Sequence, residues 1–249
     1  QLLRREPMIS QLRMKLDLSD GPLRSILLCA CTCMSAPASV SAQEISAAEK
    51  LLLQTNHMQT VDAPAVLTYS YRKTGAAEPG FDDEVRVVVS KINPDKSAAV
   101  SVSFLSGDRS VQLAELSDAR GNPTLLGFLE RDIAEMKRLT GGSPGYFRKR
   151  IRLALAEAQE LRPVRFTYAG KERQGQEVRI QPYLNDPLRD RFPAYKHKSY
   201  AFVVSGQVPG GLYRLRSASN EEADKGDSEA KPVGIVETLT LVKHQRLRR

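Results

Sequence analysis

Strand-like segments that follow one another without a helix between them constrain the fold of this chain most strongly. Apolar and polar residues alternate with a period of two over 85–90, 100–104 and 110–114, and turn-like sequences separate these segments. With 65–71 in front of them, they predict a four-stranded antiparallel meander. A parallel, doubly wound sheet is not expected, because it needs a helix between successive strands.

Two helices are predicted after the meander. The first begins at the N-cap Asn122, with Pro123 in its first turn, and ends at Gly141. The second begins at Ser143, and a shorter helix is predicted over 44–53. The apolar stripe of the first helix lies opposite charged residues that include Arg131 and Glu135, and it consists of Leu125, Leu126, Leu129, Ile133 and Met136.

Strand patterns resume after the second helix. A hairpin is predicted from 164–168 and 177–180, and further strands from 199–205, 213–216 and 234–242. Together these patterns predict a single α+β domain. Its curved antiparallel sheet, a half-barrel of eight or nine strands, is covered on one side by helices.

The N-terminal part of the chain has the layout of a secretory signal peptide. All three cysteines lie in one short apolar run, 25–34, which charged residues precede and small residues follow. The run is too short to span a bilayer, which needs about 20 apolar residues. We therefore predict residues 14–42 as a signal peptide that is cleaved after Ala42. A lipobox in which Cys31 becomes acylated is the alternative.

The predicted cleavage leaves a cysteine-free domain. Residues 1–13 are then an upstream segment, 43–243 the domain and 244–249 a basic tail. Without disulfides an exported domain depends on its hydrophobic core, and a chain of about 200 residues is long enough to bury one. A signal peptide in front of cysteine-free cargo favours the bacterial periplasm as the location.

The best match to a catalytic motif is Gly141–Gly145, which fits Gly-x-Ser-x-Gly around Ser143. In hydrolases a strand precedes this motif, whereas a helix precedes it here, so Ser143 is predicted to cap the second helix. A serine hydrolase with Asp186 or Asp190 and His197 is a remote alternative. The three histidines lack the spacing of metal ligands. We therefore predict a protein that is not an enzyme and has no metal site and no cofactor.

The outer face of the second predicted helix is basic through Arg148, Lys149, Arg150 and Arg152. Such a face is commonly just solvated, but it also fits contact with an anionic membrane surface or an acidic envelope protein. Export argues against a nucleic-acid partner. So does the lack of tryptophan and of alternating aromatic and basic residues.

The apolar faces of the predicted strands allow two interpretations. They form either a packed core beneath the helices or the lining of a cavity that takes an acyl chain. The residues concerned are Val87, Val89, Val102, Phe104, Phe166, Ile180 and Phe202. Valine and phenylalanine serve either use, so the sequence leaves both open.

The order of elements after the signal peptide is a helix, a meander, two helices and returning antiparallel strands. This order resembles the periplasmic outer-membrane lipoprotein carriers, the LolA-like half-barrel group, over roughly residues 47–242. The segments 121–144 and 208–213 look like signatures of a family of exported proteins. The resemblance implies a curved sheet that is lidded by helices and encloses an apolar cavity for acyl chains.

Two functions follow as expectations. The first is a periplasmic, non-enzymatic protein that binds or transports a lipid or another apolar ligand in the cavity of the half-barrel. The second is a protein-interaction or envelope-assembly factor with the same fold and a filled core, which acts through its surface.

Overall fold

The computed structural model describes residues 45–75, 78–220 and 234–247, which belong to one compact unit, Gln43–Arg249. The predicted signal peptide, the lipobox cysteine Cys31 and the last two residues of the predicted tail lie outside the described residues. Among the helices that the structure describes, none is long and apolar enough to cross a membrane.

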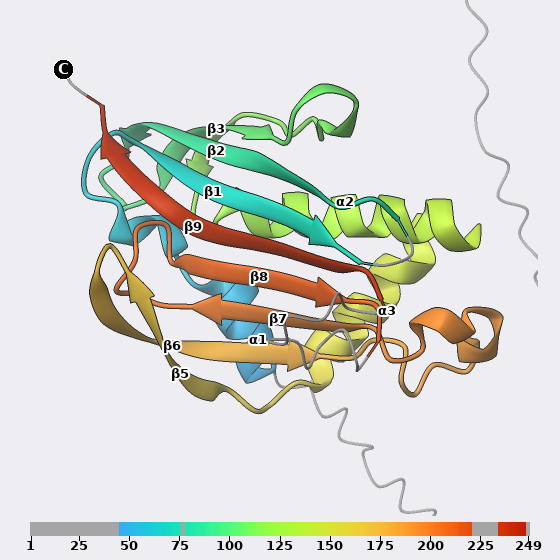
Figure 1. Ribbon diagram of the computed structural model, residues 1–249. Helices are drawn as coiled ribbons and strands as arrows, with labels where there is room; N and C mark the ends of the chain where they lie inside the picture. The colour runs from blue at the N-terminus through green and yellow to red at the C-terminus, as the bar shows by residue number, and fades with distance from the viewer. Residues whose placement is uncertain (1–44, 76–77, 221–233, 248–249) are drawn as a thin grey trace, which may run out of the picture. The chain divides into compact units, whose positions relative to one another are not determined.

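Nine antiparallel strands form one open, curved sheet (Figure 1). Their order is β4-β3-β2-β1-β9-β8-β7-β6-β5, so the last strand joins the two halves by pairing with β1 and β8. This is the predicted α+β architecture. The strands are β1 (Ala65–Thr74), β2 (Phe81–Ile92), β3 (Ala98–Phe104), β4 (Leu116–Ala119), β5 (Arg162–Tyr168), β6 (Lys171–Ile180), β7 (Ser199–Val204), β8 (Leu212–Ala218) and β9 (Val236–Arg246).

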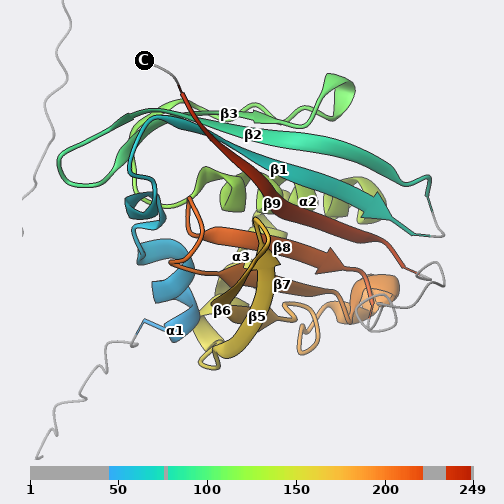
Figure 2. The same ribbon diagram turned by 60° about the vertical axis from the view of Figure 1, so that its left-hand side comes forward.

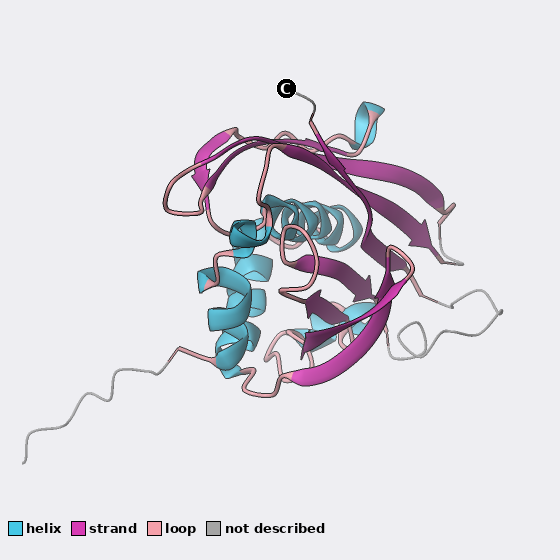
Figure 3. Cartoon of the chain, turned by 90° about the vertical axis from the view of Figure 1, so that its left-hand side faces the viewer, coloured by secondary structure: helices cyan, strands magenta, loops and turns pink. Residues whose placement is uncertain are grey.

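Helices cover the concave face of the sheet, which curves around them (Figures 2 and 3). The long helices begin at the predicted caps, because Asn122 accepts a hydrogen bond from the Thr124 backbone and Ser143 accepts one from the Tyr146 backbone. The helical elements are α1 (Ala47–Glu49), the π-helical η1 (Lys50–Gln54), α2 (Pro123–Thr140), α3 (Pro144–Glu157) and the 3₁₀ turns η2 (His57–Thr60), η3 (Gly107–Arg109), η4 (Arg189–Arg191) and η5 (Pro193–Tyr195).

The predicted fourth strand at 110–114 is wrong. Within that segment only Val111 forms a bridge, to Phe104, and the fourth strand is β4 at 116–119. The chain leaves the sheet at Leu105, which has a φ of 62°, and then makes the turn η3. The alternation over 110–114 therefore belongs to a loop along the sheet edge.

Two strands are longer than predicted. The β5–β6 hairpin turns at Ala169 and Gly170, which both have positive φ as a two-residue hairpin loop requires. Lys171–Gln176 therefore continue β6, although the sequence predicted a turn there. β9 extends to Arg246, which pairs with Ala65 of β1, so the chain up to that residue belongs to the sheet.

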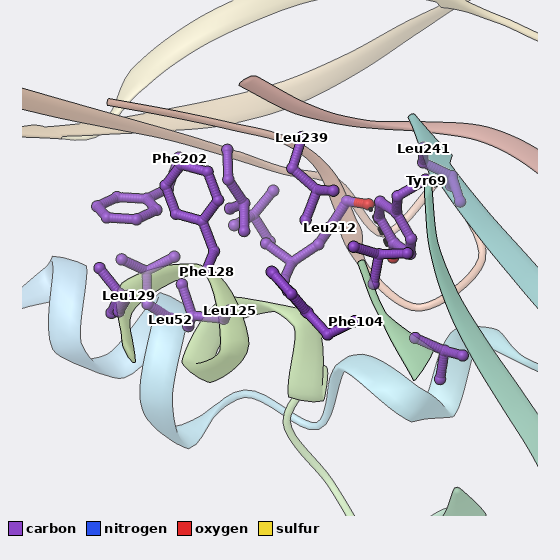
Figure 4. Close-up of a cluster of buried hydrophobic side chains, with 14 of the residues drawn as sticks. Leu52, Tyr69, Phe104, Leu125, Phe128, Leu129, Phe202, Leu212, Leu239 and Leu241 are labelled. Atoms are coloured by element: carbon purple, nitrogen blue, oxygen red, sulfur yellow. Dashed lines mark hydrogen bonds between the residues drawn. The ribbon is translucent and has the colours of Figure 1, made fainter. Parts of the chain in front are cut away.

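Side chains from the sheet and the helices fill the space between them as one cluster (Figure 4). Leu52 of η1, Phe104 of β3, Phe128 of α2 and Phe202 of β7 are each at most 1% exposed. Gly127 lets α2 approach β3 closely, because a Cβ at this position would lie 2.6 Å from the ring of Phe104. The concave side of the sheet is therefore packed with side chains.

The buried face of α2 differs from the predicted stripe. Leu126 is 57% exposed, whereas Asp132 is 1% exposed among packed side chains. Arg131 and Glu135, which were expected on the solvent side, are half-buried against the sheet. Polar contacts with the strands outweigh the apolar pattern here, and they are described with the functional site.

Asn122 joins three parts of the fold through its side-chain amide. The Nδ2 group donates to the Tyr69 hydroxyl of β1 and to the Gly210 carbonyl, both at 2.8 Å, while Oδ1 accepts from Thr124. The Asn122 backbone N–H donates to Nδ1 of His57 at 3.2 Å. Gly210 permits this approach, because it has a φ of 76° and a Cβ there would lie 2.8 Å from Nδ2. The two signature segments of the sequence therefore meet at this amide.

Replacing Asn122 by alanine is expected to lower the free energy of unfolding by about 3 kcal/mol or more. The Tyr69 hydroxyl and the Gly210 carbonyl would lose a partner in the interior, and α2 would lose its cap. Urea denaturation measures the change. The matched control is Asn185→Ala at an exposed position, expected to shift stability by less than about 0.5 kcal/mol. Equal effects of the two variants would refute the role of this amide.

Candidate functional site

The seven residues predicted to line a cavity lie in the core or pack against it. Four surface clefts of 230 to 460 Å³ in the described structure are lined by other residues. Five of the seven are buried, namely Val87, Val89, Phe104, Ile180 and Phe202. The other two, Val102 and Phe166, are half-buried and pack against the core. Their role as ligand contacts stays a prediction.

Phe166 also shows how the β5–β6 hairpin sits on the sheet. Its ring stacks on Tyr213 of β8 with centroids 3.9 Å apart, although two strands separate β5 from β8 in the sheet order. The Tyr213 hydroxyl donates to the carbonyl of Thr167 at 3.2 Å. The far half of the hairpin therefore bends across β7. All six residues of β7 are buried, as its apolar sequence predicted.

One of the four predicted basic residues of α3 holds the loop 181–198. The Arg150 guanidinium donates two hydrogen bonds to the carbonyl of Pro182, at 3.0 and 3.1 Å, and lies 3.5 Å from the carboxylate of Asp186. The Tyr146 hydroxyl donates to the same carboxylate. Burial and this carboxylate raise the pKa of Tyr146 to about 12, so the phenol stays protonated at neutral pH. Arg150 therefore positions a loop.

The other three predicted basic residues face solvent. Arg148 is paired with Glu130 of α2 at 2.6 Å, an exposed pair. Lys149 and Arg152 are exposed and form no ion pair within the part of the chain that the structure describes. Arg191 of η4, also exposed, stands 6.0 Å over the ring of Phe192, which packs on the first turn of α3. We call Lys149, Arg152 and Arg191 the basic surface.

Ser143 is the helix cap that the sequence predicted. Its Oγ lies 3.2 Å from the Tyr146 backbone nitrogen, from which it accepts a hydrogen bond. Asp186, one acid considered for a triad, is 3% exposed and accepts from Tyr146 and from the Leu188 backbone. Its oxygens therefore anchor the loop. Among the described residues, no group of three or more His, Cys, Asp or Glu residues is placed to hold a metal ion.

A buried polar network that was not predicted ties α2 to the sheet. Asp132 of α2 accepts hydrogen bonds from Lys198 Nζ at 2.8 Å, Tyr200 Oη at 2.6 Å and Ser217 Oγ at 3.1 Å. All four residues are at most 5% exposed. Since a substrate cannot reach a carboxylate this deeply buried, the network serves to position the helix.

Two further ion pairs extend this contact along α2. Arg131 donates to the Tyr71 hydroxyl at 2.9 Å and pairs with Glu237 of β9 at 3.1 Å. Burial raises the pKa of Glu237, and the nearby Asp132 raises it further. One turn along, Glu135 pairs with Lys73 of β1 at 2.8 Å.

One signal in the sequence points to this network. Asp132 stands four residues after Phe128 and four before Met136, on the buried stripe of α2. A charged residue on such a stripe requires a buried partner. The partners themselves gave no local signal, because Lys198 and Glu237 lie in distant segments that only the fold brings together.

Comparisons with known proteins found matches among solved structures only. No family model matches the sequence, and no curated protein does. Among solved structures, MucB in the Pseudomonas aeruginosa MucA/MucB complex is 13% identical with a TM-score of 0.36, and MucB bound to MucA(peri) is 9% identical with a TM-score of 0.35. Each match covers 80% of this chain, which spans only 55–56% of those MucB chains.

A LolA superfamily protein from Nitrosomonas europaea is 12% identical, with a TM-score of 0.23, 81% of this chain covered and 94% of that one. A member of the LolA superfamily is thus among the solved structures that the comparison matches to this chain. At such low similarity the match concerns the order and arrangement of elements and does not transfer a ligand or a partner.

Stability is expected to depend on pH through Glu135. Hydrogen bonds from Arg138 and Lys73 lower its pKa from 4.5 to about 2, so its stabilisation is present above pH 4.5 and lost as the pH falls toward 2. Between about pH 5 and pH 3, the unfolding free energy should fall by about 2 kcal/mol more in the wild type than in Glu135→Gln. Urea denaturation at both pH values tests this. The control Glu157→Gln, at an exposed position, should follow the wild type. An equal fall of the unfolding free energy with pH in Glu135→Gln and the wild type would contradict the role of Glu135.

Proposed function

We propose that this protein is an exported, non-enzymatic binding protein that acts through its surface, on an acidic envelope protein or an anionic membrane surface. The packed interior is the observation that carries the proposal. Side chains of α2, η1 and the sheet fill the concave side as one cluster, which leaves the outer surfaces for contact with a partner. The periplasmic location rests on the predicted signal peptide.

The basic surface is the part of the molecule best suited to such a partner. Lys149 and Arg152 are exposed cations without an ion pair among described residues, and Arg191 adds a third from the adjoining loop. Arg150 and the aromatic contacts of Phe192 hold that loop against α3. Lys149 and Arg152 lie three residues apart on one helix, and the loop that carries Arg191 is fixed to that helix, so the elements that carry these charges are preorganised.

Reversing two charges of this surface is expected to weaken binding to anionic vesicles. Lys149→Glu with Arg152→Glu should lower binding to phosphatidylcholine vesicles that contain phosphatidylglycerol by at least about tenfold, because each cation near an anionic surface contributes about 1 kcal/mol. Co-sedimentation measures the fraction of the protein that is bound to the vesicles.

The matched control is Lys91→Glu with Lys171→Glu, which changes net charge equally at exposed positions on other elements. The control should bind like the wild type. If both double variants lose binding equally, attraction depends on net charge and the basic surface is not the contact site. If the wild type does not bind, the membrane partner is excluded.

An apolar ligand in the interior is the second candidate. The observation in its favour is that Val87, Val89, Phe104 and Phe202 share one apolar cluster on the helix-covered side of the curved sheet. Displacement of the helices would expose that cluster to an acyl chain. This function needs a second conformation, whereas surface binding uses the packed state.

Native mass spectrometry after gentle purification separates the two candidates. A packed interior predicts a spectrum dominated by the mass of the polypeptide alone. An added mass that corresponds to a lipid, and that disappears when Phe202 is replaced by tryptophan to fill the interior, would favour the apolar-ligand function instead. A circular dichroism spectrum identical to that of the wild type would show that the variant is folded.

A further inference from the structure

A second surface feature has a chemistry unlike the basic surface. A cleft of about 290 Å³ lies between the segment η1–η2 on one side and the middle of β6 and the end of β7 on the other. None of its 14 lining residues is Asp, Glu, Lys or Arg, although these make up 27% of the chain. Instead it gathers four of the chain's 12 glutamines and an asparagine: Gln59, Gln174, Gln176, Gln207 and Asn56.

The walls of the cleft are fixed by hydrogen bonds. The Gln174 backbone N–H donates to Oε1 of Gln207 at 3.0 Å, and the Ser205 hydroxyl donates to the Gln174 carbonyl. On the other wall, the Gln59 backbone N–H donates to Oδ1 of Asn56 at 3.2 Å. These bonds hold the two walls in defined conformations, so the cleft is preformed.

His57 at the base of the cleft is neutral. Burial lowers its pKa, and Nδ1 accepts the Asn122 N–H, so the proton sits on Nε2 and is donated to the Leu51 carbonyl at 2.9 Å. A charged group entering the cleft would therefore find no counter-charge among the lining residues.

Amide groups in the cleft are available to a ligand. The side chains of Gln59 and Gln176 are exposed and make no hydrogen bond to another described residue, and Nε2 of Gln207 is not used either. Each carboxamide offers an N–H donor beside a C=O acceptor, the same pair that a peptide group presents. Leu51 and Val204 add apolar side chains to the lining.

We infer that this carboxamide cleft binds an uncharged, extended peptide segment of a partner protein. Charged segments are disfavoured because they would be desolvated without a partner. Saccharides are disfavoured because, apart from the ring of His57, no aromatic side chain lines the cleft on which a sugar ring would stack. The inference rests on the proposed function, partner binding, and gives it a second contact that does not involve the basic surface.

The test uses the full ¹⁵N-labelled chain and three blocked peptides. N-acetyl-tetraalanine amide should cause saturable shifts of the side-chain amide signals of Gln59, Gln176 and Gln207. The same peptide with one glutamate or one lysine should bind at least about tenfold more weakly. Maltotriose should cause no shift. Shifts by maltotriose but not by the alanine peptide would overturn the inference in favour of a saccharide, and no shifts with any probe would overturn it outright.

Variants locate the contact. Gln176→Glu keeps the shape of the side chain and removes its donor, so it should weaken binding of the alanine peptide about fivefold. Gln112→Glu, at an exposed position away from the cleft, is the matched control and should leave binding unchanged. Lys149→Glu with Arg152→Glu should also leave it unchanged. Equal weakening by Gln176→Glu and Gln112→Glu would place the peptide elsewhere. If the wild type binds the alanine peptide but not the anionic vesicles, only the proposed membrane contact of the basic surface is refuted.

Discussion

The contact between β1 and α2 is the constraint on which the rest of the structure depends. Three successive inward positions of β1 each hold one residue of the helix or its cap, through Tyr69 with Asn122, Tyr71 with Arg131 and Lys73 with Glu135. The three bonds measure 2.8 to 2.9 Å. Because a strand places every second side chain on one face, they fix both the axis and the rotation of α2.

Fixing α2 in this way decides what fills the concave side. A helix held only by apolar contacts can slide or rotate at low cost, whereas breaking a buried ion pair costs about 3 to 5 kcal/mol. Asp132, Arg131 and Glu135 therefore oppose the opening that an interior ligand would require. The helix and the sheet therefore act as a scaffold whose concave side is filled. On the proposed function, a partner contacts groups outside the sheet and away from the inner faces of the helices.

The parts of the fold that the sequence predicted are those with short-range causes. The caps at Asn122 and Ser143, the period-two strands and the apolar β7 are determined by neighbouring residues, and the structure confirms them. The failures have long-range causes. Leu126 lies at the edge of the apolar stripe, and ion pairs with distant strands hold α2 with this edge toward solvent. The alternation at 110–114 forms no strand, because the chain has already left the sheet at Leu105.

The two candidate surfaces also differ in how much of each could be predicted from the sequence. The basic face of α3 was visible in the sequence, but only the structure separates Arg150, which holds the loop, from Lys149 and Arg152, which face solvent. The carboxamide cleft had no local signal at all, since its walls come from segments more than 100 residues apart. His57 connects that cleft to the framework, because Asn122, whose side chain caps α2, donates its backbone N–H to the imidazole of His57. Asn122 therefore contributes both to the position of α2 and to the shape of the cleft. A change at Asn122 that loosens α2 should also disturb the cleft.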